Sequence, residues 1–164
     1  MGELSHFDAQ GRGRMVDVSG KDSTVREAIA HGVIDMELAT LERIREGRIK
    51  KGDVLAVADV AAVMAAKRTP DLIPMCHPIA LSGVEINFED FEVDGRGVID
   101  VKVTVRCEGP TGVEMEALTA VSAALLTIYD MCKAIDRGMR MKSVELLRKS
   151  GGKSGLWQRE DSSK

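Results

Sequence analysis

Aromatic residues are scarce in this chain, and neither sign of charge is in large excess. Its 164 residues include one Trp, one Tyr and three Phe, and 23 Lys and Arg residues stand against 26 Asp and Glu residues. Nucleic-acid-binding proteins usually combine a basic excess with aromatic side chains on which bases stack. The composition therefore argues against a nucleic-acid partner.

Long hydrophobic runs are also missing. Asp59, Lys67 and Asp130 interrupt the Ala-rich stretches, so no run reaches the roughly 20 residues that a bilayer span requires. The first 13 residues are polar, without the apolar run and small-residue cleavage site of a secretory signal. We therefore expect a cytoplasmic protein that makes no membrane contact.

Cysteine is limited to Cys76, Cys107 and Cys132, which cannot all pair within one chain. We expect three reduced thiols, with Cys107 and Cys132 as packing residues. Cys76 and the adjacent His77 have no further ligands at a metal-binding spacing, so no metal site is predicted. The role of Cys76, packing or function, stays open at this point.

What remains is the composition of a single globular domain. A chain of this length buries roughly two-thirds of its unfolded surface without disulfides or a metal. We predict a mobile N-terminal segment over residues 1–23, a single domain over 24–155, and a polar C-terminal tail over 156–164.

Periodicity indicates the elements of that domain. Residues 24–36 carry apolar side chains at helical spacing, but Gly32 and its apolar neighbours favour a strand, which is our prediction. Three prolines predict a rigid irregular loop over 69–78. We further predict helices at 37–46, 54–67 and 112–135, and strands at 84–89, 101–106 and 143–147 with a turn at Asp94-Gly95. This order implies an α+β, ferredoxin-like sandwich with helices on one face of an antiparallel sheet.

Asp130 and Lys133 share a face of the long helix that lies away from its apolar stripe. The simplest interpretation is a surface ion pair worth a few tenths of a kcal/mol. The rest of that face is small, however, which predicts that a second protein surface packs there. Partial desolvation beside an opposite charge would then shift both pKa values and make the pair a candidate acid and base.

Glu114 and Glu116 either stabilise the positive end of this helix or serve a site, and the sequence favours neither. Glu116 lies on the same side as Asp130, about 21 Å along the axis. The two side chains of one chain therefore cannot contact the same atom.

Basic residues gather at 50–51, 67–68 and 148–153, either as solvated surface or as a site for an anion such as a polyphosphate. The tail KSGGKSG is not a Walker A loop, because Leu147 stands where that pattern needs glycine. His77, fixed between prolines, fits a structural and a functional role equally well.

Together these motifs closely resemble one family, the cyclic pyranopterin monophosphate synthases, which are the accessory protein C of molybdenum-cofactor biosynthesis. The resemblance covers most of residues 4–155 through the runs LSHFDAQGRGRMVDVS, TVREA, KKGDV, AAKRTPDLIPMCHP, TGVEMEALTAVSAALLTIYDMCKA and LLRKSGGKSG. Several long runs in one order are far more specific than any short signature.

The resemblance implies a ferredoxin-like lyase, assembled as a homohexamer (a trimer of dimers) with active sites at the dimer interface. Its substrate would be (8S)-3',8-cyclo-7,8-dihydroguanosine 5'-triphosphate, converted to cyclic pyranopterin monophosphate and pyrophosphate. No cofactor is required beyond Mg²⁺ accompanying the triphosphate. The alternative, from another class, is a non-catalytic nucleotide-binding sensor or scaffold.

The resemblance also implies roles for individual residues. Asp130 and Lys133 would be the general acid and base, with Lys51 as a catalytic or phosphate-binding lysine. We expect this pair to face Lys51, Glu116 and the 75–77 loop of a neighbouring subunit. The remaining substrate contacts are Met75, Cys76, His77, Glu114, Met115 and Glu116, and the phosphate ligands are Arg26, Lys67, Arg68, Lys149 and Lys153.

Overall fold

The computed structural model describes residues 15–160, and within them the predicted order of elements is confirmed with two additions. The elements are β1 (Thr24–Glu37), α1 (Leu38–Arg45), α2 (Val54–Lys67), α3 (Thr69–Leu72), β2 (Leu81–Val93), β3 (Arg96–Gly109), α4 (Glu114–Cys132), β4 (Arg140–Ser150) and β5 (Trp157–Gln158). The additions are α3 and β5. Residues 1–14 of the predicted mobile segment and residues 161–164 of the predicted tail lie outside the described residues.

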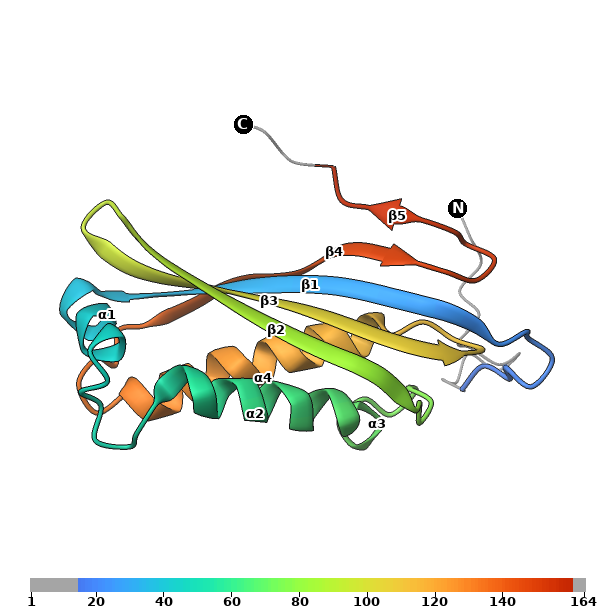
Figure 1. Ribbon diagram of the computed structural model, residues 1–164, viewed down its shortest axis with the longest axis horizontal. Helices are drawn as coiled ribbons and strands as arrows, with labels where there is room; N and C mark the ends of the chain where they lie inside the picture. Colours follow the sequence, from blue (N-terminus) through green and yellow to red (C-terminus); the bar gives the residue numbers. More distant parts are fainter. Residues whose placement is uncertain (1–14, 161–164) are drawn as a thin grey trace, which may run out of the picture.

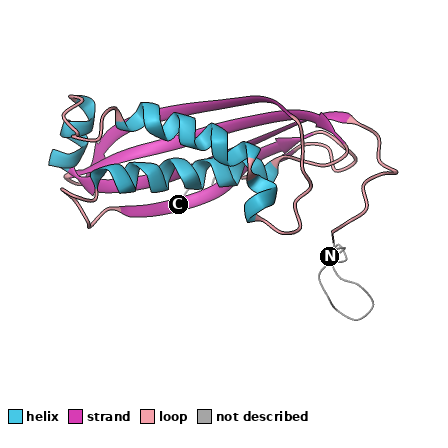
Figure 2. Ribbon diagram, turned by 90° about the horizontal axis from the view of Figure 1, so that it is seen from below, coloured by secondary structure: helices cyan, strands magenta, loops and turns pink. Residues whose placement is uncertain are grey.

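The five strands form one antiparallel sheet in the order β2-β3-β1-β4-β5. The helices cover one face of this sheet and leave the other face free of helices (Figures 1 and 2). The α+β class, with helices packed on one face of an antiparallel sheet in a ferredoxin-like arrangement, is therefore confirmed.

The central strand β1 is the segment whose periodicity was ambiguous. Its even-numbered residues face the helices, and Ala28, Ala30 and Ile34 are fully buried there. Gly32 is part of this packing, because a Cβ at Gly32 would lie 2.7 Å from Val121 Cγ1 of α4. The glycine therefore does not end the strand. It allows α4 to approach the strand closely.

The hairpin of β2 and β3 confirms its prediction. Asp94 and Gly95 both have positive φ angles, 51° and 75°, as a two-residue turn between twisted strands requires. Val101, Val103 and Val105 of β3 are fully buried against the helices.

The helices depart from prediction mainly at α3 and α4. The long helix α4 is shorter at both ends than the predicted 112–135. Residues 69–72, predicted as irregular, form the single turn α3, because Pro70 stands in its first turn, where no amide donor is needed. The prediction of a second protein surface over the small face of α4 is wrong for Ala120 and Ala124, which are buried within this chain.

The helix α2 covers that face of α4 instead. Ala58, Ala62 and Ala66 of α2 are buried, and small side chains on both helices permit a close approach. Asp53 caps α2 by accepting a hydrogen bond from Ala56 N at 3.0 Å, as predicted. By length and composition α4 could cross a bilayer, yet half of its apolar stretch is buried inside the domain.

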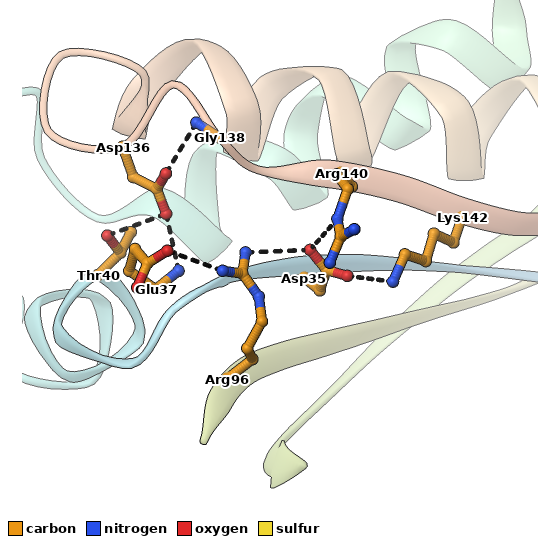
Figure 3. A network of polar contacts seen from close by, with 8 residues as sticks. All are labelled: Asp35, Glu37, Thr40, Arg96, Asp136, Gly138, Arg140 and Lys142. Carbon is orange, nitrogen blue, oxygen red and sulfur yellow. Dashed lines mark hydrogen bonds and ion pairs between the residues drawn. The ribbon is translucent and has the colours of Figure 1, made fainter. Parts of the chain in front are cut away.

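A polar network closes the end of the sheet near the C-terminus of α4 (Figure 3). Asp35 on β1 is 5% exposed and pairs with Arg96 of β3, with Arg140 of β4 and with Lys142 of β4. Asp136 accepts hydrogen bonds from the backbone of residues 37 and 138 and lies near the Thr40 hydroxyl. We call this set the Asp35 network; it ties three strands to the loop after α4.

Candidate active site

Three of the predicted catalytic residues meet at the C-terminal end of α4. The Asp130 carboxylate contacts Lys133 Nζ at 2.6 Å and Lys51 Nζ at 2.7 Å, one ammonium on each oxygen. Lys51 Nζ also donates a hydrogen bond to the Asp130 carbonyl oxygen at 2.8 Å. We call this set the lysine–aspartate cluster.

The position of Lys51 corrects one expectation. Lys51 was expected to reach Asp130 from a neighbouring subunit, but it does so from the connection between α1 and α2 of the same chain. That connection lies beside the end of α4 because α2 packs along α4. All three members of the cluster thus belong to one chain.

The electrostatics of the cluster set its resting charges. Hydrogen bonds from Lys133 and Lys51 lower the pKa of Asp130 to about 2, and Asp130 in turn raises the pKa of Lys133. Asp130 is therefore a carboxylate at neutral pH and Lys133 an ammonium group. Asp130 and Lys133 are 55% and 52% exposed, so within a single chain the expected desolvation is absent. With these charges the carboxylate is the possible proton acceptor and the ammonium the possible donor, each weakened by the ion pair that stabilises its charged form.

Most of the predicted phosphate ligands meet at the other end of the molecule, where β1 and α4 begin and β3 and β4 end (Figure 1). A cavity of about 560 Å³ opens there, which we call the anion pocket. Its walls are formed by Lys21, Asp22, Thr24, Arg26, Pro110, Thr111, Gly112, Glu114, Lys149, Gly152, Lys153 and Ser154. Four cationic side chains thus face two carboxylates, an arrangement that attracts an anion.

Contacts inside the anion pocket hold its polar groups in place. Arg26 Nε donates a hydrogen bond to the Gly109 carbonyl oxygen at 2.8 Å. Lys149 Nζ donates to Ser154 Oγ at 2.6 Å and pairs with Glu114 at 3.4 Å. Lys149 therefore joins β4 both to the loop that follows it and to the start of α4.

A second cavity of about 320 Å³ adjoins the first, because Lys21, Gly112 and Glu114 line both. We call it the Cys76 pocket. It gathers the predicted substrate contacts Met75, Cys76, His77, Glu114, Met115 and Glu116. His77 Nε2 lies 2.8 Å from the carbonyl oxygen of Val16, which fixes the imidazole against the segment before β1.

Glu116 is the most buried carboxylate in these pockets, at 3% exposure. Burial raises its pKa, its own backbone N–H opposes that shift, and the negative charge of Glu114 adds to it. Burial, with the charge of Glu116, also raises the pKa of the Cys76 thiol. Cys76 is therefore a neutral thiol, unsuited to act as a thiolate nucleophile or metal ligand.

Two predicted phosphate ligands lie apart from both pockets. Lys67 and Arg68 are exposed at the C-terminal end of α2 and line neither cavity. The two groups of site residues are also separated from each other, because Glu116 and Asp130 stand on one continuous helix, about 21 Å apart along its axis.

Sequence reasoning missed Lys21, Thr111 and Ser154, which also line the pockets. The run Pro110-Thr111-Gly112 between a strand and a helix was the available signal, because glycine-containing turns before helices often cradle anions. Within residues 15–160, no group of three His, Cys, Asp or Glu side chains is arranged to hold a metal ion.

Comparison with known proteins yields a consistent result. The MoaC family model matches residues 15–152. A curated cyclic pyranopterin monophosphate synthase of Desulfitobacterium hafniense is 58% identical over 159 residues, which cover 97% of this chain and 96% of the relative. The protein of that name from Thermoanaerobacter sp. (strain X514) is 61% identical over 96% of this chain and 98% of its own length. That from Chloroflexus aggregans is 58% identical over 98% and 96%.

Proposed function

The chain belongs to the MoaC family, and we propose that it acts as its relatives are named, as a cyclic pyranopterin monophosphate synthase, a lyase of molybdenum-cofactor biosynthesis. It converts (8S)-3',8-cyclo-7,8-dihydroguanosine 5'-triphosphate to cyclic pyranopterin monophosphate and pyrophosphate. The observation that carries this function is identity of 58–61% with enzymes of that name over nearly the whole of both chains.

The anion pocket supplies what the triphosphate needs. Arg26, Lys149 and Lys153 converge on a cavity large enough for a polyphosphate, and fixed cations stabilise the charge that develops on departing pyrophosphate. Mg²⁺ would enter with the triphosphate, held by phosphate oxygens and at most one or two carboxylates, for which the anion pocket offers Asp22 and Glu114. Lys67 and Arg68 would act as further phosphate ligands only across a subunit boundary.

The lysine–aspartate cluster supplies proton transfer. Opening a purine-derived ring and reclosing it as a pterin moves protons at several heteroatoms. With the resting charges described above, Asp130 is the proton acceptor and Lys133 the donor, while Lys51 holds the carboxylate from its other side. The purine-derived ring of the substrate would contact His77, Glu116 and Cys76 in the adjoining pocket.

The distance between the two groups of residues supports an active site that is shared between chains. A separation of about 21 Å along α4 exceeds the reach of one compact nucleotide. A homohexamer built as a trimer of dimers would bring the lysine–aspartate cluster of one chain to the pockets of another. Exposed apolar side chains on the outer side of α2 and α4, namely Val57, Val60, Met64 and Leu126, are consistent with burial in such an assembly. We further place the enzyme in the cytoplasm, where its nucleotide-derived substrate would be made.

Pyrophosphate release tests the function directly. Purified protein mixed with the cyclised triphosphate is expected to release one pyrophosphate for each cyclic pyranopterin monophosphate formed. Saturable binding of the nucleotide with no product would instead support the non-catalytic sensor or scaffold.

A further inference from the structure

Arg26 is held on two sides in the anion pocket. On one side its Nε donates a hydrogen bond to the Gly109 carbonyl oxygen. On the other side the backbone of Gly152 lies so close that a Cβ on that residue would stand 2.2 Å from Nη1 and 2.8 Å from Cζ of Arg26. Within residues 15–160, Nη1 and Nη2 have no hydrogen-bond acceptor or ion pair. In this part of the chain nothing competes with a ligand for these two donors.

The two adjacent glycines of this turn differ in what their hydrogen atoms face. Gly151 has φ 98°, and a Cβ there would lie 2.3 Å from the Val25 carbonyl oxygen, which is backbone of β1 and cannot move aside. Gly152 has φ 67°, and the three atoms nearest its Cβ would all belong to the guanidinium at the far end of the Arg26 side chain. A side chain at Gly151 would therefore disturb the sheet, whereas one at Gly152 would displace the guanidinium first.

We propose that Gly152 is a positioning residue for the substrate's phosphates, because its lack of a side chain keeps the Arg26 guanidinium seated in the anion pocket. A guanidinium whose Nε is already bonded presents its remaining donors in a fixed geometry, suited to two parallel hydrogen bonds to a phosphate. Prior ordering lowers the cost of binding. The inference rests on the proposed function, since it assumes that the triphosphate occupies this pocket.

The same turn contains a matched control. Gly155 also has a positive φ, 62°, and its N–H donates to the Gly152 carbonyl oxygen at 3.2 Å, but a Cβ there would meet no atom within 4 Å. Gly155→Ala therefore adds the same kind of backbone strain as Gly152→Ala without the collision. A difference between these two variants reports the contact with Arg26.

The experiment uses the full-length enzyme and four variants: Gly152→Ala, Gly155→Ala, Arg26→Ala and the double variant Gly152→Ala/Arg26→Ala. Steady-state kinetics with the cyclised triphosphate give KM and kcat, calorimetry gives the Kd of inorganic pyrophosphate, and thermal unfolding gives Tm. We expect Gly152→Ala to raise KM and the pyrophosphate Kd about tenfold over Gly155→Ala, the size of one charge-assisted hydrogen bond. We expect kcat within about threefold and equal Tm values for these two variants.

The double variant separates Arg26 from the neighbouring Lys153. If Gly152 acts through Arg26, adding Gly152→Ala to Arg26→Ala changes the pyrophosphate Kd by less than about twofold. A full tenfold effect that persists without Arg26 would overturn the inference, as would equal affinities of Gly152→Ala and Gly155→Ala. Failure of the wild-type protein to bind pyrophosphate is a different result, because it would overturn the phosphate site itself.

Discussion

Asp130 shows how the immediate partners of a residue decide its chemistry. Two ammonium groups bind its two oxygens, and the resulting pKa of about 2 keeps it an ionised carboxylate at neutral pH although it is more than half exposed. An exposed pair of this kind contributes little to stability. Removing it should therefore affect catalysis far more than folding.

Asp130→Asn and Lys133→Ala are each expected to lower kcat by about 10²–10⁴-fold, the usual contribution of a positioned acid or base, with Tm almost unchanged. Asp90→Asn is the control, because Asp90 is also an exposed carboxylate with a basic partner, Arg45, but lies on β2 away from both pockets. Near wild-type turnover in either cluster variant would remove that residue from the proton-transfer assignment.

Glu116 presents the opposite case, a carboxylate whose pKa burial raises above its ordinary value. The folded state then binds the proton more tightly than the unfolded state, so this residue's contribution to stability falls as pH rises through its folded-state pKa. Glu116→Gln is expected to unfold at a higher temperature than wild type at pH 8 and at nearly the same temperature at pH 4. Tm measured across this range checks the sign, and a variant less stable than wild type at pH 8 would contradict it.

At the scale of the elements, β1 organises the domain. It pairs with β3 on one side and β4 on the other, buries small residues under α4, and turns charged residues to the helix-free face. On that face Glu27 pairs with Arg106 and Arg148, and His31 lies between Asp100 and Glu145. The Asp35 network continues the same pattern at the end of the strand.

Asp35→Asn is expected to destabilise the protein by about 2 kcal/mol at pH 7, below the roughly 3–5 kcal/mol of fully buried pairs, because Arg140 and Lys142 are about half exposed. Burial would raise the pKa of Asp35, but bonds from Lys142 and Arg140 outweigh it and hold the pKa near 2. This stabilisation is present above pH 4 and is lost as pH falls toward 2.

Chemical denaturation at several pH values tests this prediction. Glu37→Gln serves as the control, because Glu37 also pairs with Arg96 but is 65% exposed, so a change of less than about 0.5 kcal/mol is expected. A difference between Asp35→Asn and wild type that persists at pH 2 would contradict the assignment.

The sequence predicts elements well where local chemistry decides them. The Asp94-Gly95 turn and the Asp53 cap were predictable because one or two residues determine each. The placement of Lys51 beside Asp130 was not, because it depends on how α2 packs along α4. The strand β5 likewise exists through pairing of Trp157 and Gln158 with β4, and an isolated two-residue segment carries no strand signal of its own. The identities of the site residues came from the family resemblance, and their grouping came from the fold.

At the scale of the whole molecule, the grouping changes how a shared active site must be tested. Lys51 and Asp130 fall in the same half of the site. In a mixture of their variants every chain therefore carries one defect in that half, and no intact half can form. Asp130→Asn and Lys149→Ala fall in different halves. After subunit exchange in a one-to-one mixture, we expect Asp130→Asn with Lys149→Ala to recover roughly a quarter of wild-type activity.

The mixture of Asp130→Asn with Lys51→Ala is the control and should recover no activity. Exchange is verified with mass-labelled subunits. Proven exchange with no recovery in the first mixture would place the whole site in one chain. Recovery in both mixtures would show that Lys51 and Asp130 of one chain serve different active sites.

The helix α4 carries residues of both groups and therefore fixes the distance and the angle between them. One residue inserted into α4 between Glu116 and Asp130 would shift Asp130 by about 1.5 Å and rotate it by about 100° relative to the pockets. Residues inserted in the turn at Asp94-Gly95 would leave that spacing intact, since the hairpin tip lies apart from α4 (Figure 1). We therefore expect insertions to be tolerated at the tip of the sheet and not in the middle of the longest helix.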